Sequence, residues 1–222
     1  MAGIKDFQEW SDDFNGTVAT FPTSADPASP WLVDDVSSSG TPTYTKGTSE
    51  AVLTLVSTNE AEVVALHFGD ALDFDIDLIQ SIEMRVKIGA ATFTSGSILT
   101  FGLGSARSDT ANDVAANAWF RMEGANSTTV VYCETDDGTR DVDDISSGVT
   151  LGTTYKRFYI DFTGGKSSVK FYIDGARVAA SQVFDMSGYS AGLQPIIQLQ
   201  KAANTNVDSV TIDYVSVICK RS

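Results

Sequence analysis

Two neighbouring segments with strict two-residue alternation constrain the fold more than any other feature of the chain. In the first segment, 156–162, one face of an extended strand would carry Phe158, Ile160 and Phe162. In the second segment, 169–173, the corresponding face would carry Val169, Phe171 and Ile173. Asp174-Gly175 follows directly, a pair typical of a type I′ hairpin turn, and in that register Phe171 lies opposite Val178. The alternation therefore predicts antiparallel strands with one buried and one wetter face.

The rest of the chain continues this pattern of short strands separated by turn residues. Two strand-like segments near the start read WLVDDV and PTYTKG, and further candidate strands cover 51–58, 62–69, 81–88, 97–104, 118–123, 129–135, 193–199 and 208–219. No long helical pattern interrupts them. The chain is therefore predicted to be all-β, an antiparallel two-sheet sandwich formed by a single domain at 17–222.

The last candidate strand, SVTIDYVSVICK, changes phase part-way along. Val210 and Ile212 share a face with Tyr214, whereas Val215 and Val217 take the opposite face. Burial on both faces, or a bulge near Tyr214, would each explain the change.

The first sixteen residues are predicted to form a short arm. Ile4, Phe7 and Trp10 recur there at roughly helical spacing among polar neighbours. A segment of this length is too short to form its own core, so its apolar side chains must be buried elsewhere. Two alternatives are open: the arm packs on its own domain, or these three residues bind a partner.

Composition limits the classes of function. The chain has 222 residues and a formal net charge of −14, which disfavours binding to nucleic acid because such a surface repels phosphate. No segment has the length of a membrane span, and no cleavable secretion signal is expected at the start. Cys133 and Cys219 are too few for a disulfide framework and are expected to be free thiols in a reducing compartment.

Short motifs in a familiar order carry a family resemblance. These are DDFNG at 12–16, SIEMRVKI at 81–88, the FYIDG hairpin and the closing TIDYVSV. They resemble the concanavalin A-like lectin/glucanase jelly roll, which includes laminarinase-type glycoside hydrolases and laminin G-like modules. The resemblance implies the fold and leaves the activity open.

A second resemblance lies in the residue pattern of four further segments: AWFRMEG, ETDDGTRDVDD, YKRFYIDF and FDMSGYSAGLQPIIQLQK. Together they are similar to non-enzymatic structural proteins of tailed bacteriophages, in particular head decoration (cement) proteins. This resemblance implies a chain that binds the major capsid protein on the outside of the shell and stabilises it. It also implies a location on the virion after assembly in the host cytoplasm, and a homo-oligomer, with a trimer on a local three-fold axis as the specific expectation.

Glycoside hydrolysis places a requirement on the spacing of the acidic residues. Retaining glucanases of this fold place their acids at alternate positions of one strand, because a nucleophile and an acid/base must lie close together. On AWFRMEG, Glu123 has only Trp119 and Arg121 as same-face neighbours. The pattern therefore predicts that the chain is not an enzyme.

Metal and cofactor sites find little support in the sequence. The acid-rich segment DDGTRDVDD reads as a loop and supplies the only candidate calcium ligands, although it lacks the EF-hand pattern; these are Asp136, Asp137, Asp143 and Asp144. His67, the single histidine, has no sequence motif pointing to it and is interpreted as structural. No cofactor is expected. The leading hypothesis is thus a capsid decoration protein, the alternative is a carbohydrate-binding module that could serve host attachment, and the third is a divergent hydrolase.

Overall fold

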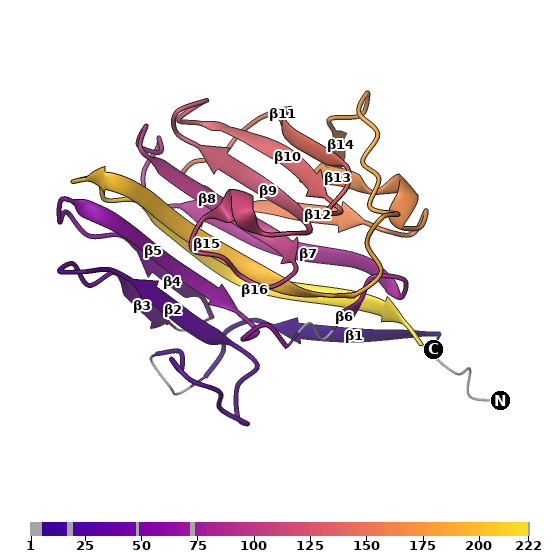
Figure 1. Cartoon of the computed structure of the whole chain (residues 1–222), viewed down its shortest axis with the longest axis horizontal. Coiled ribbons are helices and arrows are strands. Elements are labelled where there is room, and N and C mark those ends of the chain that lie inside the picture. The colour runs from indigo at the N-terminus through magenta and orange to yellow at the C-terminus, as the bar shows by residue number, and fades with distance from the viewer. Residues whose placement is uncertain (1–5, 17–19, 48, 72–73, 222) are drawn as a thin grey trace.

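The computed structural model describes residues 6–16, 20–47, 49–71 and 74–221. Over these ranges the chain forms two antiparallel sheets packed face to face, with two single-turn 3-10 helices, η1 (Ala111–Asp113) and η2 (Lys166–Ser168) (Figure 1). This confirms the predicted all-β sandwich. Neither helix in the described part of the chain has the length and apolar content needed to cross a membrane.

Each sheet contains, in an interior position, one of the two long strands nearest the C-terminal end of the sequence, β16 (Ser209–Lys220) in the first sheet and β15 (Gly192–Asn204) in the second. The first sheet has the spatial order β14 (Ala176–Val178), β13 (Lys170–Ile173), β12 (Lys156–Asp161), β7 (Ile79–Ile88), β16 (Ser209–Lys220), β4 (Ala51–Thr54) and β3 (Thr43–Lys46), and β1 (Phe7–Asp12) also pairs with β16. The second sheet has the order β11 (Asp141–Thr150), β10 (Val130–Asp136), β9 (Asn117–Glu123), β8 (Ser97–Gly104), β15 (Gly192–Asn204), β5 (Glu60–His67) and β2 (Leu32–Val36), and β6 (Phe74–Asp75) pairs with β15.

The two alternating segments form the hairpins that their sequence predicts. β12 pairs with β13, and across the following turn Phe171 lies opposite Val178. Asp174 and Gly175 both adopt positive φ angles, 50° and 81°, as a type I′ turn requires. The six predicted apolar side chains of these segments are all buried.

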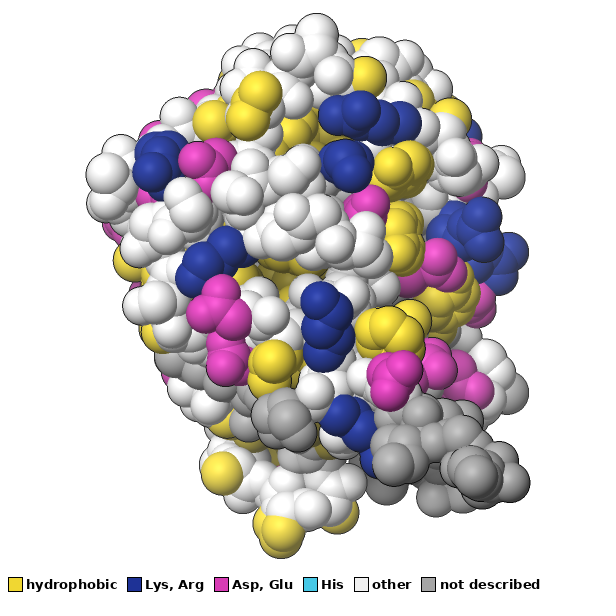
Figure 2. All heavy atoms as spheres, turned by 90° about the vertical axis from the view of Figure 1, so that its right-hand side faces the viewer, with side chains coloured by type: hydrophobic (Ala, Val, Ile, Leu, Met, Phe, Trp, Pro, Cys, Tyr) yellow, Lys and Arg dark blue, Asp and Glu magenta, His cyan; other side chains and the backbone are white. Residues whose placement is uncertain are grey.

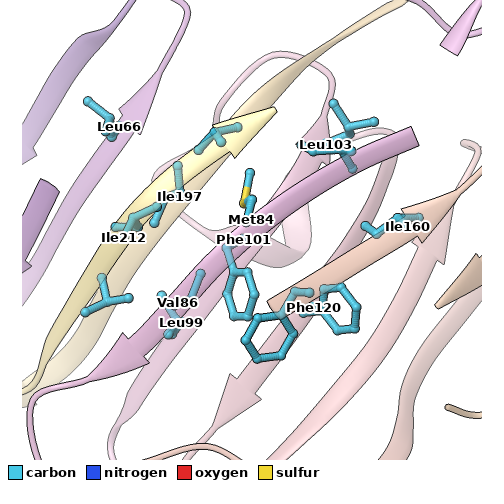
Figure 3. Close-up of a cluster of buried hydrophobic side chains, with 14 of the residues drawn as sticks. Leu66, Met84, Val86, Leu99, Phe101, Leu103, Phe120, Ile160, Ile197 and Ile212 are labelled. Atoms are coloured by element: carbon cyan, nitrogen blue, oxygen red, sulfur yellow. The ribbon is translucent and has the colours of Figure 1, made fainter. Parts of the chain in front are cut away.

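The core lies between the two sheets and is rich in phenylalanine (Figure 3). The rings of Phe101 and Phe120, from the second sheet, meet Phe158 from the first sheet at centroid distances of 4.8 and 4.9 Å. Both contacts are edge-to-face, an arrangement favoured by the ring quadrupoles. Inward-facing side chains of both sheets thus interdigitate as expected for a sandwich.

A β-bulge explains the phase change in β16. The pairing of β16 with β7 shifts register between Ile212 and Tyr214. Val210 and Ile212 are buried before the shift, and Val215 and Val217 are buried after it. Of the two explanations that the sequence leaves open, the bulge near Tyr214 is the one found in the structure.

The N-terminal arm is not helical, although its apolar residues recur at roughly helical spacing. Phe7–Asp12 form a strand that pairs with β16 along its whole length. Trp10 packs against Trp31, Phe68 and Phe74 of its own domain, with centroid distances of 5.7, 4.9 and 6.2 Å. Phe7 remains 49% exposed. At this end of the molecule acidic and basic side chains are interspersed with small hydrophobic patches (Figure 2). Ile4 lies outside the described residues.

Candidate functional site

The alternation of β9 places three side chains that could take part in binding or catalysis on the outer face of the second sheet. Phe120 and Met122 point into the core. Trp119, Arg121 and Glu123 therefore lie on the opposite face, which is turned away from the first sheet.

Neighbouring strands extend this polar face in register. Arg121 lies opposite Thr100 of β8 and opposite Tyr132 of β10, and Thr100 in turn lies opposite Gln198 of β15. Four adjacent strands thus contribute one row of polar side chains across the sheet.

Arg121 lies close to three carboxylates of this face. Its Nη2 lies 2.9 Å from Oε2 of Glu123, and its Nη1 lies 3.3 Å from Oε2 of Glu134. Its Nε lies 3.8 Å from Oδ1 of Asp144 on β11. On its own strand Glu123 has only Trp119 and Arg121 as same-face neighbours, as the sequence indicates. The further acids, Glu134 and Asp144, come from the neighbouring strands β10 and β11.

Glu134 is the buried member of this group, only 2% exposed. Burial raises the pKa of its carboxyl to about 7, although Arg121 opposes the shift. Desolvation disfavours the charged carboxylate, so the proton is retained near neutral pH. A carboxyl that is protonated near neutrality can act as a general acid.

This shift predicts a pH-dependent stability that Glu134→Gln should remove. From the ordinary glutamate pKa near 4.5 up to about 7, the unfolded chain releases this proton while the folded chain keeps it. The contribution to stability is thus complete at low pH and is lost as the pH rises to about 7, by roughly 1.4 kcal/mol per pH unit. Urea unfolding should show the wild type losing up to about 3 kcal/mol more than the variant across this window. Parallel pH profiles for the two proteins would contradict the shift.

A twelve-residue segment, 105–116, crosses the outer face between β8 and β9 and is called the cover below. Its two ends are held together, since Ser105 N donates to Ala116 O at 2.8 Å and Ala116 N donates to Ser105 Oγ at 3.1 Å. Ala111 and Val114 of the cover pack on Trp119, forming a small apolar cluster separate from the core. The cover therefore buries Trp119 on what would otherwise be a solvent-facing surface.

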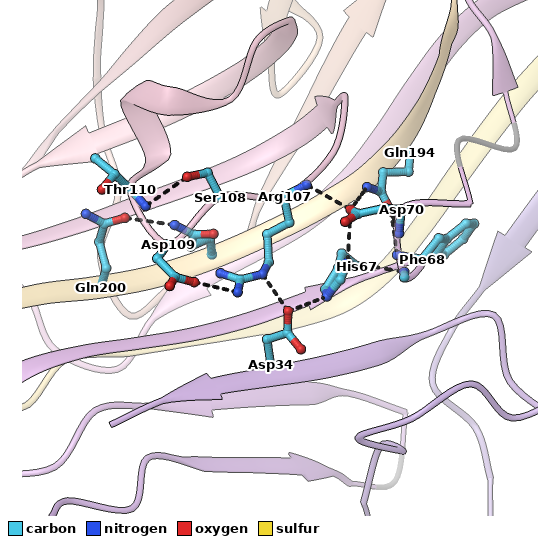
Figure 4. Close-up of polar contacts among 12 residues, drawn as sticks. Asp34, His67, Phe68, Asp70, Arg107, Ser108, Asp109, Thr110, Gln194 and Gln200 are labelled. Atoms are coloured by element: carbon cyan, nitrogen blue, oxygen red, sulfur yellow. Dashed lines mark hydrogen bonds and ion pairs between the residues drawn. The ribbon is translucent and has the colours of Figure 1, made fainter. Parts of the chain in front are cut away.

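A network of charges holds one end of the cover on the sheet (Figure 4). Nε of Arg107 lies 2.6 Å from Oδ2 of Asp34, and the backbone N–H of Arg107 donates to Oδ1 of Asp70 at 2.8 Å. His67, 3% exposed, lies between these two aspartates and contacts Asp34 through Nε2 at 3.1 Å. Burial lowers the pKa of His67, while the two aspartates act in the opposite direction. His67 thus supports the network that holds the cover.

Beside the cover the outer face is hollowed and open. A hollow of about 350 Å³ lies where β8 begins and β9 ends, and its lining includes Ile98, Glu123 and Gln200. The Glu123 side chain is 23% exposed, so it links this open hollow to the Arg121 cluster. The lining of this hollow thus combines amide, carboxylate and apolar groups.

The four candidate calcium ligands do not converge. Among the described residues, no group of three or more His, Cys, Asp or Glu side chains is arranged to hold a metal ion. Asp137 instead accepts hydrogen bonds from the backbone of Thr139, Arg140 and Gly188, at 3.0, 2.7 and 2.7 Å. Asp143 and Asp144 lie on β11 rather than in a loop, since only the short turn after Asp136 is irregular.

Comparison with known proteins gives results for structure but none for sequence. No protein-family model and no curated sequence matches the chain. SCLam, a non-specific endo-β-1,3(4)-glucanase from family GH16, superposes with a TM-score of 0.64 at 12% identity, covering 100% of this chain and 94% of its own. The laminarinase catalytic domain from Thermotoga maritima MSB8 gives 0.62 at 14% identity, covering 98% and 100%. This chain has their fold.

A carbohydrate recognition domain gives a similar match. The carbohydrate recognition domain of Emp47p superposes with a TM-score of 0.61 at 10% identity, covering 96% of this chain and 97% of its own. The predicted concanavalin A-like jelly roll is thereby confirmed.

The prediction that the chain is not an enzyme is corrected by the same comparison. Two of the superposing structures are named as an endo-glucanase and a laminarinase catalytic domain. The exclusion of enzymatic activity therefore does not hold, because the chain has the fold of these enzymes. The resemblance to capsid decoration proteins stays a prediction.

Proposed function

We propose that this chain is a carbohydrate-active domain that binds a glucan-type polysaccharide on the outer face of its second sheet, in the hollow beside Glu123. The observation that carries the proposal is the position of Glu123. Its carboxylate joins the open hollow to the charged cluster around Arg121, on a fold shared with glucanases and a carbohydrate recognition domain. Sugar hydroxyls would donate to this carboxylate, and hydrogen bonds to charged groups are among the stronger ones.

Glu123→Gln tests this proposal because it keeps the shape of the side chain and removes its charge. The wild type should bind soluble mixed-linkage β-glucan in titration calorimetry, and the variant should bind about tenfold more weakly, since a charge-assisted bond contributes about 1.5–3 kcal/mol. Glu9→Gln is the matched control, because Glu9 lies on the first sheet, where its carboxylate accepts a hydrogen bond from Ser216 at 2.9 Å. Equal binding by all three proteins would refute the assigned site, and an absence of binding to a panel of glucans would refute the function.

Hydrolysis is the second candidate, and the raised pKa of Glu134 favours it. The two carboxylates that flank Arg121 offer one buried acid and one more exposed carboxylate, Glu134 and Glu123. Glycosidases divide their roles between two such groups. Release of reducing ends from the same glucan, absent in Glu123→Gln and falling as the pH rises above about 7, would support hydrolysis.

Attachment to a virus shell is a separate proposal and does not exclude either carbohydrate function. Its partner would be the major capsid protein, and its residues those of the arm. Of the two predicted arm residues that the structure describes, Phe7 is exposed and free to bind a partner, whereas Trp10 packs within the domain. The wild type should bind isolated shells, and Phe7→Ala should bind them more weakly. Equal binding by the two proteins would contradict a contact through Phe7.

A further inference from the structure

The outer face beneath the cover carries polar atoms that the cover does not satisfy. Oγ1 of Thr100, Oδ1 of Asn117 and Oε1 of Gln198 are buried and have no hydrogen-bond partner among the described residues. Their residues are 1%, 3% and 1% exposed. Buried polar atoms are normally paired, and leaving them unpaired is unfavourable. This surface is therefore better matched to a hydrogen-bonding ligand than to the segment that lies on it.

The floor beneath the cover is closely packed where it carries two glycines. Gly102 and Gly104 of β8 bring no side chain to this face, and a Cβ at Gly102 would lie 2.6 Å from Cα of Trp119. A Cβ at Gly104 would lie 2.7 Å from Cδ1 of Ile196 on β15 and 3.4 Å from Cγ1 of Val114 in the cover. Without side chains at these positions, Trp119 and Ile196 lie directly against β8. The Trp119 ring is the type of surface on which ligands with an apolar face pack.

The cover itself is held by few contacts. Apart from its closed ends, it is tied through Arg107 to Asp34 and Asp70, through Asn112 Oδ1 to Arg121 at 2.5 Å, and through the N–H of Ala111 to Gln200 at 3.2 Å. Between its closed ends, Ala111 and Val114 are its only buried residues. Segments with few buried apolar contacts open at low free-energy cost.

We propose that the cover is a displaceable segment that regulates the carbohydrate site, closing the polar row from Gln198 to Arg121 until a ligand displaces it. This inference rests on the proposed function, since it assigns a control to that same site. In the closed state Asn112 accepts a hydrogen bond from Arg121, so that this donor is not free for a ligand, and only the hollow at Glu123 is accessible. In the open state Trp119 and the unpaired polar atoms face solvent and bind the glucan chain. Because the ligand binds the open state more tightly, it shifts the population towards that state.

Shortening the cover tests the proposal, because its ends are already neighbours. Replacing residues 106–115 by Asn-Gly would join Ser105 and Ala116, which are already hydrogen bonded, through a two-residue hairpin. Affinity for soluble mixed-linkage β-glucan should rise about tenfold or more, since the closed state no longer competes. Trp119 should become quenchable by acrylamide, and added glucan should protect it. Adding Trp119→Ala to the shortened chain should abolish the gain in affinity.

Each other outcome is informative. Equal affinity of the wild type and the shortened chain overturns regulation by the cover and leaves the proposed function standing. Binding by neither chain overturns the proposed function itself. If the shortened chain does not fold, Arg107→Ala replaces it, because this change loosens one end of the cover without altering the backbone. Its affinity should rise relative to wild type, whereas Arg157→Ala, a control on the first sheet, should leave the affinity unchanged; equal affinities for both variants would count against the proposal.

Discussion

Replacing Lys201 by methionine is expected to lower the unfolding free energy by about 3–5 kcal/mol. The ammonium group of Lys201 is completely buried and lies 3.3 Å from Oε1 of Glu62, which is equally buried. It also donates to the carbonyl oxygens of Thr58 and Asn204, at 2.8 and 3.1 Å, and to that of Val56. The substitution would leave the charge of Glu62 without its partner in the interior. Urea unfolding monitored by tryptophan fluorescence would measure the loss.

Two further variants separate the ion pair from general damage. Lys170→Met removes a partly exposed lysine 4.0 Å from Asp161 and should change stability by less than about 1 kcal/mol. The double variant Lys201→Met/Glu62→Leu removes both buried charges and should regain much of the lost stability. If the double variant is as unstable as Lys201→Met, the loss of stability comes mainly from the missing hydrogen bonds to the carbonyl groups and not from the unpaired carboxylate of Glu62.

Truncating Phe171 to alanine should also cost about 3–5 kcal/mol, because it would open a cavity in the centre of the core. Phe171 is fully buried, and its ring meets those of Phe120 and Phe184 at centroid distances of 5.2 and 4.7 Å. Tyr172 is the matched control, since it is the next residue on the same strand and faces the opposite way. Tyr172→Ala should cost clearly less. An unchanged urea midpoint for Phe171→Ala would contradict burial of this face.

The sequence predicted the parts of the fold in which local pattern and burial agree. Alternation in 156–162 and 169–173 predicted the hairpins, and the phase change at Tyr214 left a bulge as one of two explanations. The strand β11 was missed because its sequence, DVDDISSGVT, lies at a sheet edge, where no face is fully buried and polar residues are tolerated. The strand β1 was missed because its pairing partner, β16, lies about two hundred residues away in the sequence.

The candidate site was harder to predict because it depends on register between strands. Glu123 and Glu134 are separated by a turn whose length does not reveal which residues face each other. Only the pairing of Trp119 with Glu134 and of Arg121 with Tyr132 brings both acids to one guanidinium. The cover was not recognised at all, since its polar sequence is that of an ordinary surface loop, and what makes it unusual is the surface it lies on.

The central positions of β15 and β16 have a consequence for how the chain folds during synthesis. β16 joins β7 to β4 in the first sheet, and β15 joins β8 to β5 in the second, yet both strands lie after residue 191. Until the ribosome has released them, each sheet consists of two strand groups with no shared partner. Pairings of such long sequence separation form slowly, because loop closure must precede the contacts that compensate for it. Residues 6–191 would therefore expose unpaired strand edges until β15 and β16 are made, and such edges favour aggregation. Removal of 192–221 should accordingly damage the fold far more than loss of an edge strand such as β3.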